Sequence, residues 1–323
     1  MLPGAPPAAS PRAAGTTRYF QSTGRAFARS RHWSVNVVGA LSLWLMRLLQ
    51  RLNLDRTANF SGWLMRQIGP WLRGHRVAQA QLAMAFPEKS DAERAEILAG
   101  MWDNFGRIGA EYAHLDGLWD YRPGKPPGRI VMDAATAERF ERLRGERKPA
   151  LMFTAHLANW ELVPLGGADI DREVAVVFRA PRVSSFTGTL TTARGARVAA
   201  FIPAGPEAPF RIREALKRNC IVGMLIDQHV VRGVDAMYFG HPCKVNPMLA
   251  LFARRFECPI YGARVVRLPG ERFRFDLTEP LIPPRDADGR IDVAATMQLI
   301  TSVIEGWVRE HPEQWFWIHR RWR

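Results

Sequence analysis

From residue 129 onward, short apolar runs alternate with longer segments whose apolar positions recur every three or four residues. The short runs have the length of buried strands, and the longer segments have the spacing of helices. The expected strands are 129–132, 149–154, 173–178, 198–202, 221–226, 258–266 and 272–277. The expected helices are 134–145, 157–168, 183–194, 207–219, 246–256 and 293–310. This alternation predicts an α/β domain with a largely parallel central sheet, flanking helices, and catalytic groups at the strand ends.

A further helical pattern lies nearer the N-terminus, where apolar residues from Val37 to Leu52 keep helical spacing and arginines lie opposite. The uncharged stretch 33–46 has 14 residues, whereas roughly 20 are needed to span hydrocarbon. We therefore expect 33–75 to be an amphipathic, membrane-anchoring segment that lies in the interface. Packing of this helix on the domain core remains an alternative.

The flanking segments complete the division of the chain. Residues 1–32 are rich in Pro, Ala, Gly, Ser and Arg and lack an apolar period, which predicts a disordered basic tail. Ser90 and Glu93 have the S-x-x-E spacing of a capping box, which predicts that a helix begins there. Residues 76–323 are expected to form one large domain.

Charge is unevenly distributed along the chain. The formal net charge is +14, and the first 76 residues carry eleven arginines against one acid, Asp55. Such a block favours an anionic partner: a membrane surface, a nucleic acid or an acidic protein. The interleaved tryptophans favour the membrane interface; they are Trp33, Trp44, Trp63 and Trp71.

The three cysteines, Cys220, Cys243 and Cys258, show no C-x-x-C spacing and no histidines at zinc-finger distances. They are most simply free thiols, so neither a structural metal nor a disulfide framework is expected.

The run 150–163 combines a strand-like apolar segment with a histidine, His156, and a glutamate five residues later, Glu161. His156 is expected at a strand-to-helix turn, where functional groups often gather. A histidine held by a carboxylate can take a proton from an alcohol near neutral pH, which acyl transfer to a hydroxyl requires. The alternative is a core histidine hydrogen-bonded to a nearby acid.

The motif His156-Leu-Ala-Asn159-Trp160-Glu161 resembles the H-x-x-N-W-E signature of the late acyltransferases of lipid A biosynthesis, the lauroyl and myristoyl transferases. Other blocks resemble that family in the same order along the chain. They are the segment from Arg76 through Phe86-Pro87-Glu88 to Arg94, then Phe178-Arg179-Ala-Pro181, Ile226-Asp227-Gln228 with Gly233-Val234, Tyr238-Phe239-Gly240-His-Pro242, and finally the stretch from Pro312 to Trp322.

This resemblance implies a glycerolipid-acyltransferase-like catalytic domain over 76–323. It also implies transfer of a fatty acyl chain, lauroyl or myristoyl, from acyl carrier protein to the hydroxyl of a 3-hydroxyacyl group on a lipid A precursor. The expected location is the cytoplasmic face of the inner membrane, in contact with its lipids. No metal or organic cofactor is indicated. Acyl carrier protein is acidic, so a basic surface would attract it.

Site roles follow from the same resemblance. His156 would be the general base, and Glu161 would hold its imidazole in the working tautomer. Arg179 would supply a cation for the oxyanion or an acceptor phosphate, although it could also be a solvated arginine at a strand end. Asp227 could orient Arg179 or an acceptor group. The remaining candidates for substrate binding are Asn159, Arg320 and Arg321; the last two belong to a terminal segment that could instead be a tail helix whose tryptophans cap the core.

Two rival functions remain open. One is acylation of another glycolipid or phospholipid, such as phosphatidylinositol mannosides, by an enzyme of the same fold. The other is a non-enzymatic basic protein that binds membranes or nucleic acid. Nucleic acid is disfavoured because no helix-turn-helix, RNA-recognition or zinc-finger pattern is present.

Overall fold

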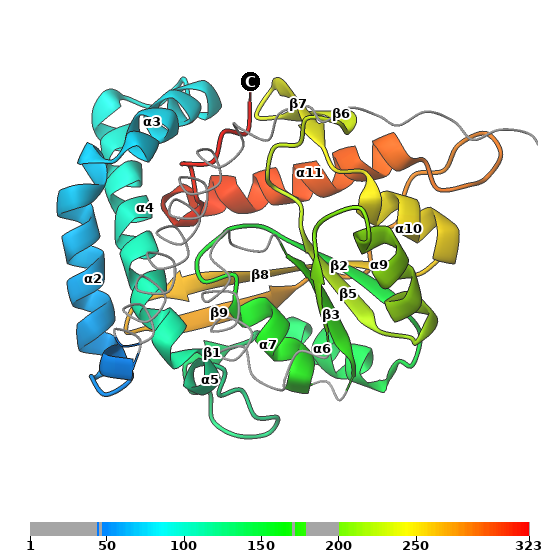
Figure 1. Ribbon diagram of the computed structural model, residues 1–323, viewed down its shortest axis with the longest axis horizontal. Helices are drawn as coiled ribbons and strands as arrows, with labels where there is room; N and C mark the ends of the chain where they lie inside the picture. The colour runs from blue at the N-terminus through cyan, green and yellow to red at the C-terminus, as the bar shows by residue number, and fades with distance from the viewer. Residues whose placement is uncertain (1–43, 45–46, 170–171, 179–199, 323) are drawn as a thin grey trace, which may run out of the picture.

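The structure, a computed structural model, describes residues 44, 47–169, 172–178 and 200–322. Its centre is a seven-stranded sheet in the order β1-β9-β8-β2-β5-β3-β4 (Figure 1). The strands are β1 (Ile130–Val131), β2 (Ala150–Thr154), β3 (Val174–Phe178), β4 (Ala200–Pro203), β5 (Ile221–Leu225), β8 (Ile260–Leu268) and β9 (Arg272–Leu277). Strands β8, β2, β5, β3 and β4 run parallel, and β9 turns back antiparallel to β8. The predicted mixed α/β fold with a largely parallel sheet is confirmed.

Helices cover both faces of the sheet (Figure 1). One face packs against α9 (Ala208–Lys217), α10 (Met248–Phe256) and α11 (Val293–Glu310), and the other packs against α6 (Ala134–Gly145) and α7 (Leu162–Asp169). Successive strand residues point to opposite faces. Accordingly, Val222 and Met224 of β5 join the first core, whereas Ile221 joins the second.

The N-terminal helices stand at one end of this sandwich (Figure 1). They are α2 (Leu54–Ile68), η1 (Gly69–Trp71), α3 (Arg73–Ala85), α4 (Asp91–Glu111), η2 (Tyr112–His114) and α5 (Leu115–Leu118). The capping box of Ser90 and Glu93 begins α4, as predicted. Helix α2 lies closely along α4. This is possible because Gly106 of α4 has no side chain, and a Cβ there would collide with the backbone of Ser61. None of the helices within the described ranges is long and apolar enough to cross a bilayer.

Several predicted elements have the expected bounds, notably the helices over 134–145 and 293–310. The helix expected over 157–168 begins only at Leu162, so residues 156–161 form a turn. The predicted tail 1–32, the helix 183–194 and most of the helix from Val37 lie outside the described residues.

A two-stranded hairpin was not predicted: β6 (Val234–Tyr238) pairs antiparallel with β7 (His241–Val245). Its turn is Phe239-Gly240, and both residues have positive φ, 52° and 73°. This is the turn geometry that suits two-residue hairpins. Phenylalanine is an unusual residue for a positive φ, so these residue types do not indicate the turn.

The terminal segment is not a tail helix. After η4 (Pro312–Gln314) it runs without regular secondary structure, and Trp315 and Trp317 are buried against the core. The alternative that tryptophans of this segment cap the core holds for Trp315 and Trp317, although no helix forms there.

Candidate active site

Strand pairing brings His156 next to Asp227. Strands β2 and β5 are parallel neighbours in which Thr154 pairs with Leu225. His156 and Asp227 each lie two residues beyond that pair, at the carboxyl edge of the sheet. The Nδ1 of His156 lies 2.8 Å from Oδ1 of Asp227, and the backbone N–H of His156 donates to Oδ2 at 2.7 Å.

Asp227 is a buried carboxylate with a third donor, the indole N–H of Trp315, at 2.9 Å. Burial alone would raise its pKa, but the attraction of His156 and the hydrogen bonds from His156 and Trp315 lower the pKa of Asp227 to about 2. Asp227 is therefore ionised at neutral pH. An ionised acceptor at Nδ1 keeps the proton on that nitrogen, which leaves the lone pair of Nε2 available as a base.

This geometry corrects the expected pairing of His156 with Glu161. The turn 156–161 reverses direction through Ala158, which has φ +44°, and carries Glu161 to a different neighbour. There Glu161 Oε1 accepts the Tyr112 hydroxyl at 2.7 Å. The helix expected from residue 157 begins only at Leu162, so residues 156–161 form a turn that keeps the two side chains on different partners.

Asn159, expected to bind substrate, is fully buried and supports the turn instead. Its side-chain N–H donates to Oε2 of Glu111 at 2.7 Å, and its Oδ1 accepts the backbone N–H of Glu161 at 3.2 Å. Glu111 is in turn held by the guanidinium of Arg267. A buried ion pair of this kind fixes geometry, because loss of either partner leaves an uncompensated charge.

The three expected arginines have different positions. Arg321 is buried, and its guanidinium donates to the backbone carbonyls of Gln228, at 3.0 Å, and Lys244, at 3.4 Å. This makes it a support of the site and corrects its expected contact with substrate. Arg320 is exposed, so contact with an anionic ligand remains a prediction. Arg179 lies outside the described residues.

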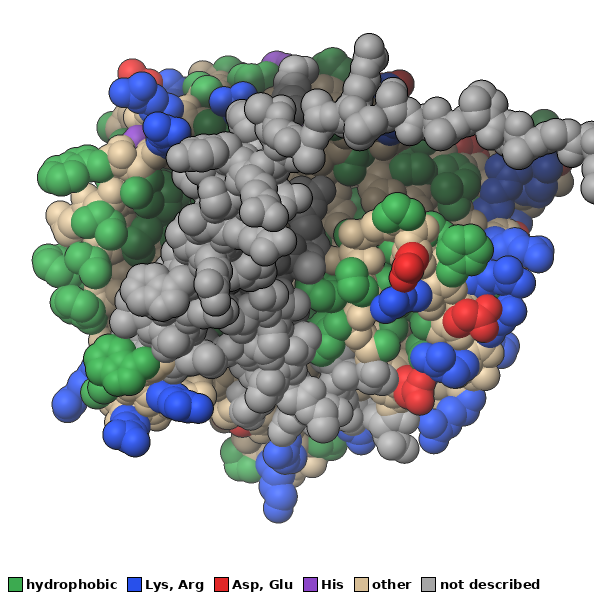
Figure 2. All heavy atoms as spheres, in the orientation of Figure 1, with side chains coloured by type: hydrophobic (Ala, Val, Ile, Leu, Met, Phe, Trp, Pro, Cys, Tyr) green, Lys and Arg blue, Asp and Glu red, His purple; other side chains and the backbone are tan. Residues whose placement is uncertain are grey.

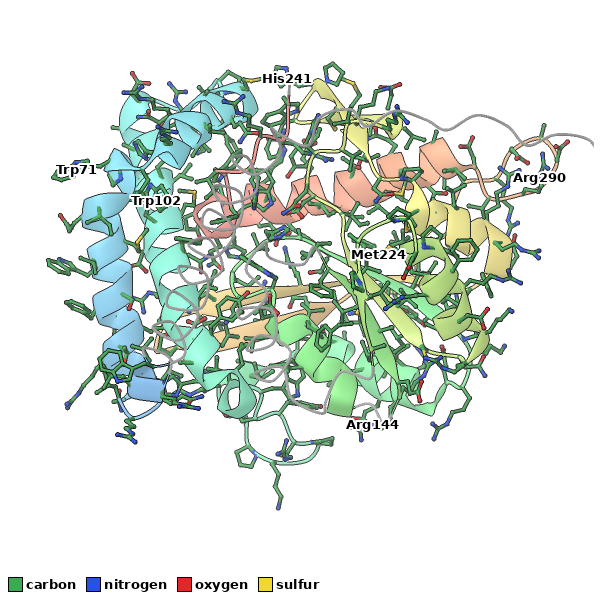
Figure 3. The ribbon with its side chains drawn as sticks, in the orientation of Figure 1. Trp71, Trp102, Arg144, Met224, His241 and Arg290 are labelled. Atoms are coloured by element: carbon green, nitrogen blue, oxygen red, sulfur yellow. The ribbon has the colours of Figure 1, made fainter. Side chains whose placement is uncertain are left out.

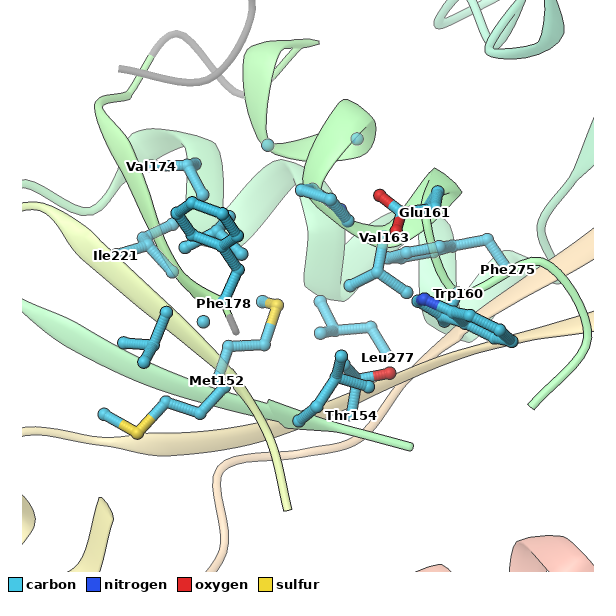
Figure 4. Close-up of a pocket in the computed structure, with 18 of the residues that line it drawn as sticks. Met152, Thr154, Trp160, Glu161, Val163, Val174, Phe178, Ile221, Phe275 and Leu277 are labelled. Carbon is cyan, nitrogen blue, oxygen red and sulfur yellow. The ribbon is translucent and has the colours of Figure 1, made fainter. Parts of the chain in front are cut away.

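An apolar cavity begins beside this turn (Figure 4). Three neighbouring strands line it mainly with alternate residues, as expected for one face of a sheet: Met152 and Thr154 of β2, Val174, Val176 and Phe178 of β3, and Ile221, Gly223 and Leu225 of β5. Val177 and Met224 also line the cavity. Trp160 and Glu161 line the same cavity, and the Trp160 ring lies 4.8 Å from the imidazole of His156. The cavity is therefore adjacent to the proposed base.

Comparison with known proteins identifies the family. The family model described as bacterial lipid A biosynthesis acyltransferase matches residues 23–323, nearly the whole chain. The chain belongs to this family. None of the curated proteins compared with it matches. The lipid A acyltransferase assignment confirms the resemblance of the motifs and makes the protein an acyltransferase.

The lipid A acyltransferase fold has no metal-binding cluster within its described part: no three His, Cys, Asp or Glu side chains are grouped to hold an ion. All three cysteines are buried free thiols, and burial raises the pKa of Cys258 to about 11. Sequence reasoning missed Glu111, Tyr112 and Trp315 as partners of the turn. Asp227 was a candidate because it follows an expected strand, but the sequence does not show that this strand neighbours the strand that precedes His156.

The two carboxylates can be separated by isosteric substitution. We expect Asp227→Asn to lower turnover by up to ~10⁴-fold, since an amide favours the wrong imidazole tautomer. Glu161→Gln should retain most activity, because Tyr112 can still donate to its side-chain oxygen. The measurement is acyl transfer per folded molecule, with thermal unfolding recorded on the same preparations. Equal losses in both variants would contradict the assignment of Asp227 as the partner of His156.

Proposed function

We propose that the protein transfers a fatty acyl group from a thioester to the hydroxyl of a 3-hydroxyacyl group on a lipid A precursor, with His156 as general base. The observation that carries this proposal is the contact of His156 Nδ1 with the ionised Asp227, which leaves Nε2 as the basic nitrogen. A hydroxyl needs such a base near neutral pH, whereas a thioester needs no activation by a protein nucleophile.

In the proposed reaction the acceptor hydroxyl gives its proton to Nε2 of His156 as its oxygen attacks the thioester carbon. The carbonyl electron pair moves to oxygen, giving a tetrahedral oxyanion. Collapse of that intermediate breaks the C–S bond, and the imidazolium returns the proton to the departing thiolate. Asp227 remains ionised throughout and stabilises the imidazolium, as the carboxylate of a Ser-His-Asp triad does.

The apolar cavity is the proposed site of the acyl chain. It follows β5 from Ile221 to Leu225, a rise of roughly 13 Å at the usual 3.3 Å per residue. Its lining is mainly aliphatic and aromatic, and Thr154 and Glu161 bring polar groups to it from the two sides of His156. An extended chain such as lauroyl or myristoyl would then lie along the sheet with its carbonyl near the base.

The outer face of α2 and η1 is the proposed membrane contact. Large apolar side chains are exposed there, including Phe60 (59%), Trp63 (49%) and Trp71 (88%). Figure 2 shows hydrophobic side chains along this edge of the molecule, and Figure 3 shows Trp71 pointing away from it. Exposed aromatic residues beside arginines suit the headgroup region. We further propose that this membrane is the inner membrane, contacted at its cytoplasmic face, and that acyl carrier protein is the donor from the aqueous side.

Lipid A mass spectrometry tests the proposed function. Cells that lack the gene should lose one secondary acyl chain, and the gene should restore it with a mass that gives the chain length. His156→Ala should fail to restore it, since removing a general base costs roughly 10²–10⁴-fold in rate. Unchanged lipid A in cells lacking the gene would refute this substrate.

Gly223 offers a test of the acyl site. A Cβ at this position would meet only the backbone oxygen of Ala175, at 4.0 Å, so a side chain has room to enter the cavity. We expect Gly223→Val to fold and to shift the preferred donor toward shorter chains, because the added methyl groups occupy the cavity. The measurement is a competition between donors of different length. An unaltered preference would place the chain elsewhere.

The membrane contact can be tested with vesicles that contain anionic lipid. Replacing Trp63 and Trp71 together by serine should weaken sedimentation with the vesicles while leaving transfer to a detergent-dispersed acceptor near normal. Ile282→Ser is the matched control, since Ile282 is 89% exposed outside α2 and η1. Equal effects of the control and the double variant would argue against a specific membrane face.

A further inference from the structure

Gln228 lies against the basic nitrogen of His156. It directly follows Asp227, and its side-chain Nε2 is 3.2 Å from Nε2 of His156 and 3.5 Å from Nε2 of His319. The two imidazole centroids are 5.4 Å apart. A single amide NH₂ group therefore faces two imidazole nitrogens at the position where an acceptor hydroxyl would meet the base.

The direction of these contacts follows from the protons. His156 carries its proton on Nδ1, facing the ionised Asp227, so its Nε2 accepts. An amide NH₂ has two hydrogens and can donate to two acceptors, and His319 presents the second nitrogen. The side-chain N–H of Gln228 therefore donates to Nε2 of His156. It must move away from that nitrogen when an acceptor hydroxyl binds there.

The backbone of both residues is held in place. The buried Arg321 donates to the carbonyl of Gln228, and the side chain of Gln81 donates to the carbonyl of His319. Only the side-chain torsions of Gln228 are then needed to move its amide. The backbone of Gln228 is thus fixed, and its side-chain NH₂ group already lies beside Nε2 of His156. Oxyanion stabilisation requires a donor placed in this way.

We propose that Gln228 is a further catalytic residue, whose side-chain N–H donates to the oxyanion of the tetrahedral intermediate. This rests on the proposed function. When the hydroxyl takes the place of the amide at Nε2 of His156, the oxygen that gains charge is attached to the carbon under attack and lies next to the displaced NH₂. His319 is a positioning residue, because its Nε2 limits the rotation of that amide.

The chemical balance is unchanged by this donor. The hydroxyl proton still goes to His156, and the carbonyl electron pair still goes to oxygen. Gln228 only lends a hydrogen bond to the oxyanion and takes it back when the C–S bond breaks. Gln228 therefore stabilises charge that exists only between the two bond changes, so its removal should lower kcat more than it raises KM.

The first test uses Gln228→Ala and the isosteric Gln228→Glu with a detergent-dispersed lipid A precursor. We expect kcat to fall on the order of 10²-fold in Gln228→Ala, as for other oxyanion donors, with KM changed only a few-fold. Gln228→Glu should fall at least as far, because a carboxylate offers no N–H and repels the oxyanion. Gln79→Glu, on the exposed side of α3, is the matched control and should behave as wild type. Wild-type kcat in Gln228→Ala would overturn the proposal.

The second test separates oxyanion donation from positioning of the base. In a His156→Ala background, Gln228→Ala should lower the residual rate by a similar factor, because an oxyanion donor acts without the base. If Gln228 only oriented His156, the second substitution would cost nothing further, and the proposal would be wrong. Gln228→Asn provides a variant that keeps an amide should Gln228→Ala fail to fold, and it too should lose kcat. Absence of transfer by the wild-type protein would instead refute the proposed function.

Discussion

The carboxylate of Asp227 joins three parts of the chain that are distant in sequence. It accepts two hydrogen bonds from His156, at the end of β2, and one from Trp315, in the segment after α11. Asp227 itself follows β5. A buried carboxylate is costly unless its oxygens are satisfied. The need to satisfy this one charge therefore fixes the turn at His156 and the path of the terminal segment together.

A second buried charge cluster supports the same turn from the opposite side. Glu111, at the end of α4, is fully buried, receives the guanidinium of Arg267 and holds Asn159. Arg267 also donates to Asn104, and the backbone carbonyl of Gln314 accepts from both Asn104 and Ala158. The turn 156–161 is thus fixed by groups whose burial makes each bond expensive to lose. That rigidity suits an imidazole that must hold one tautomer and one orientation.

The sequence predicted the fold more fully than it predicted the site. Periodic segments such as 134–145 and 293–310 were predicted with their bounds, because local spacing decides a helix that has one buried face. His156 was identified as the base candidate, but the carboxylate assigned to it was Glu161, its neighbour in sequence. The observed partner, Asp227, is 71 residues away and depends on which strands are adjacent. The residue pattern within a segment does not show which strands are adjacent in the sheet. It likewise does not show that Asn159 and Arg321 face the interior.

The terminal segment has a consequence for how the protein matures. Residues 315–321 supply the indole that holds Asp227, the ring of Phe316 near the imidazole, and the guanidinium that anchors Gln228. These residues leave the ribosome after every strand of the sheet. Strands β2 and β5 can pair earlier, but His156 and Asp227 have no complete set of partners until this segment docks. A nascent chain in which this segment has not yet been translated therefore lacks an organised site, although the strands of its sheet can already pair.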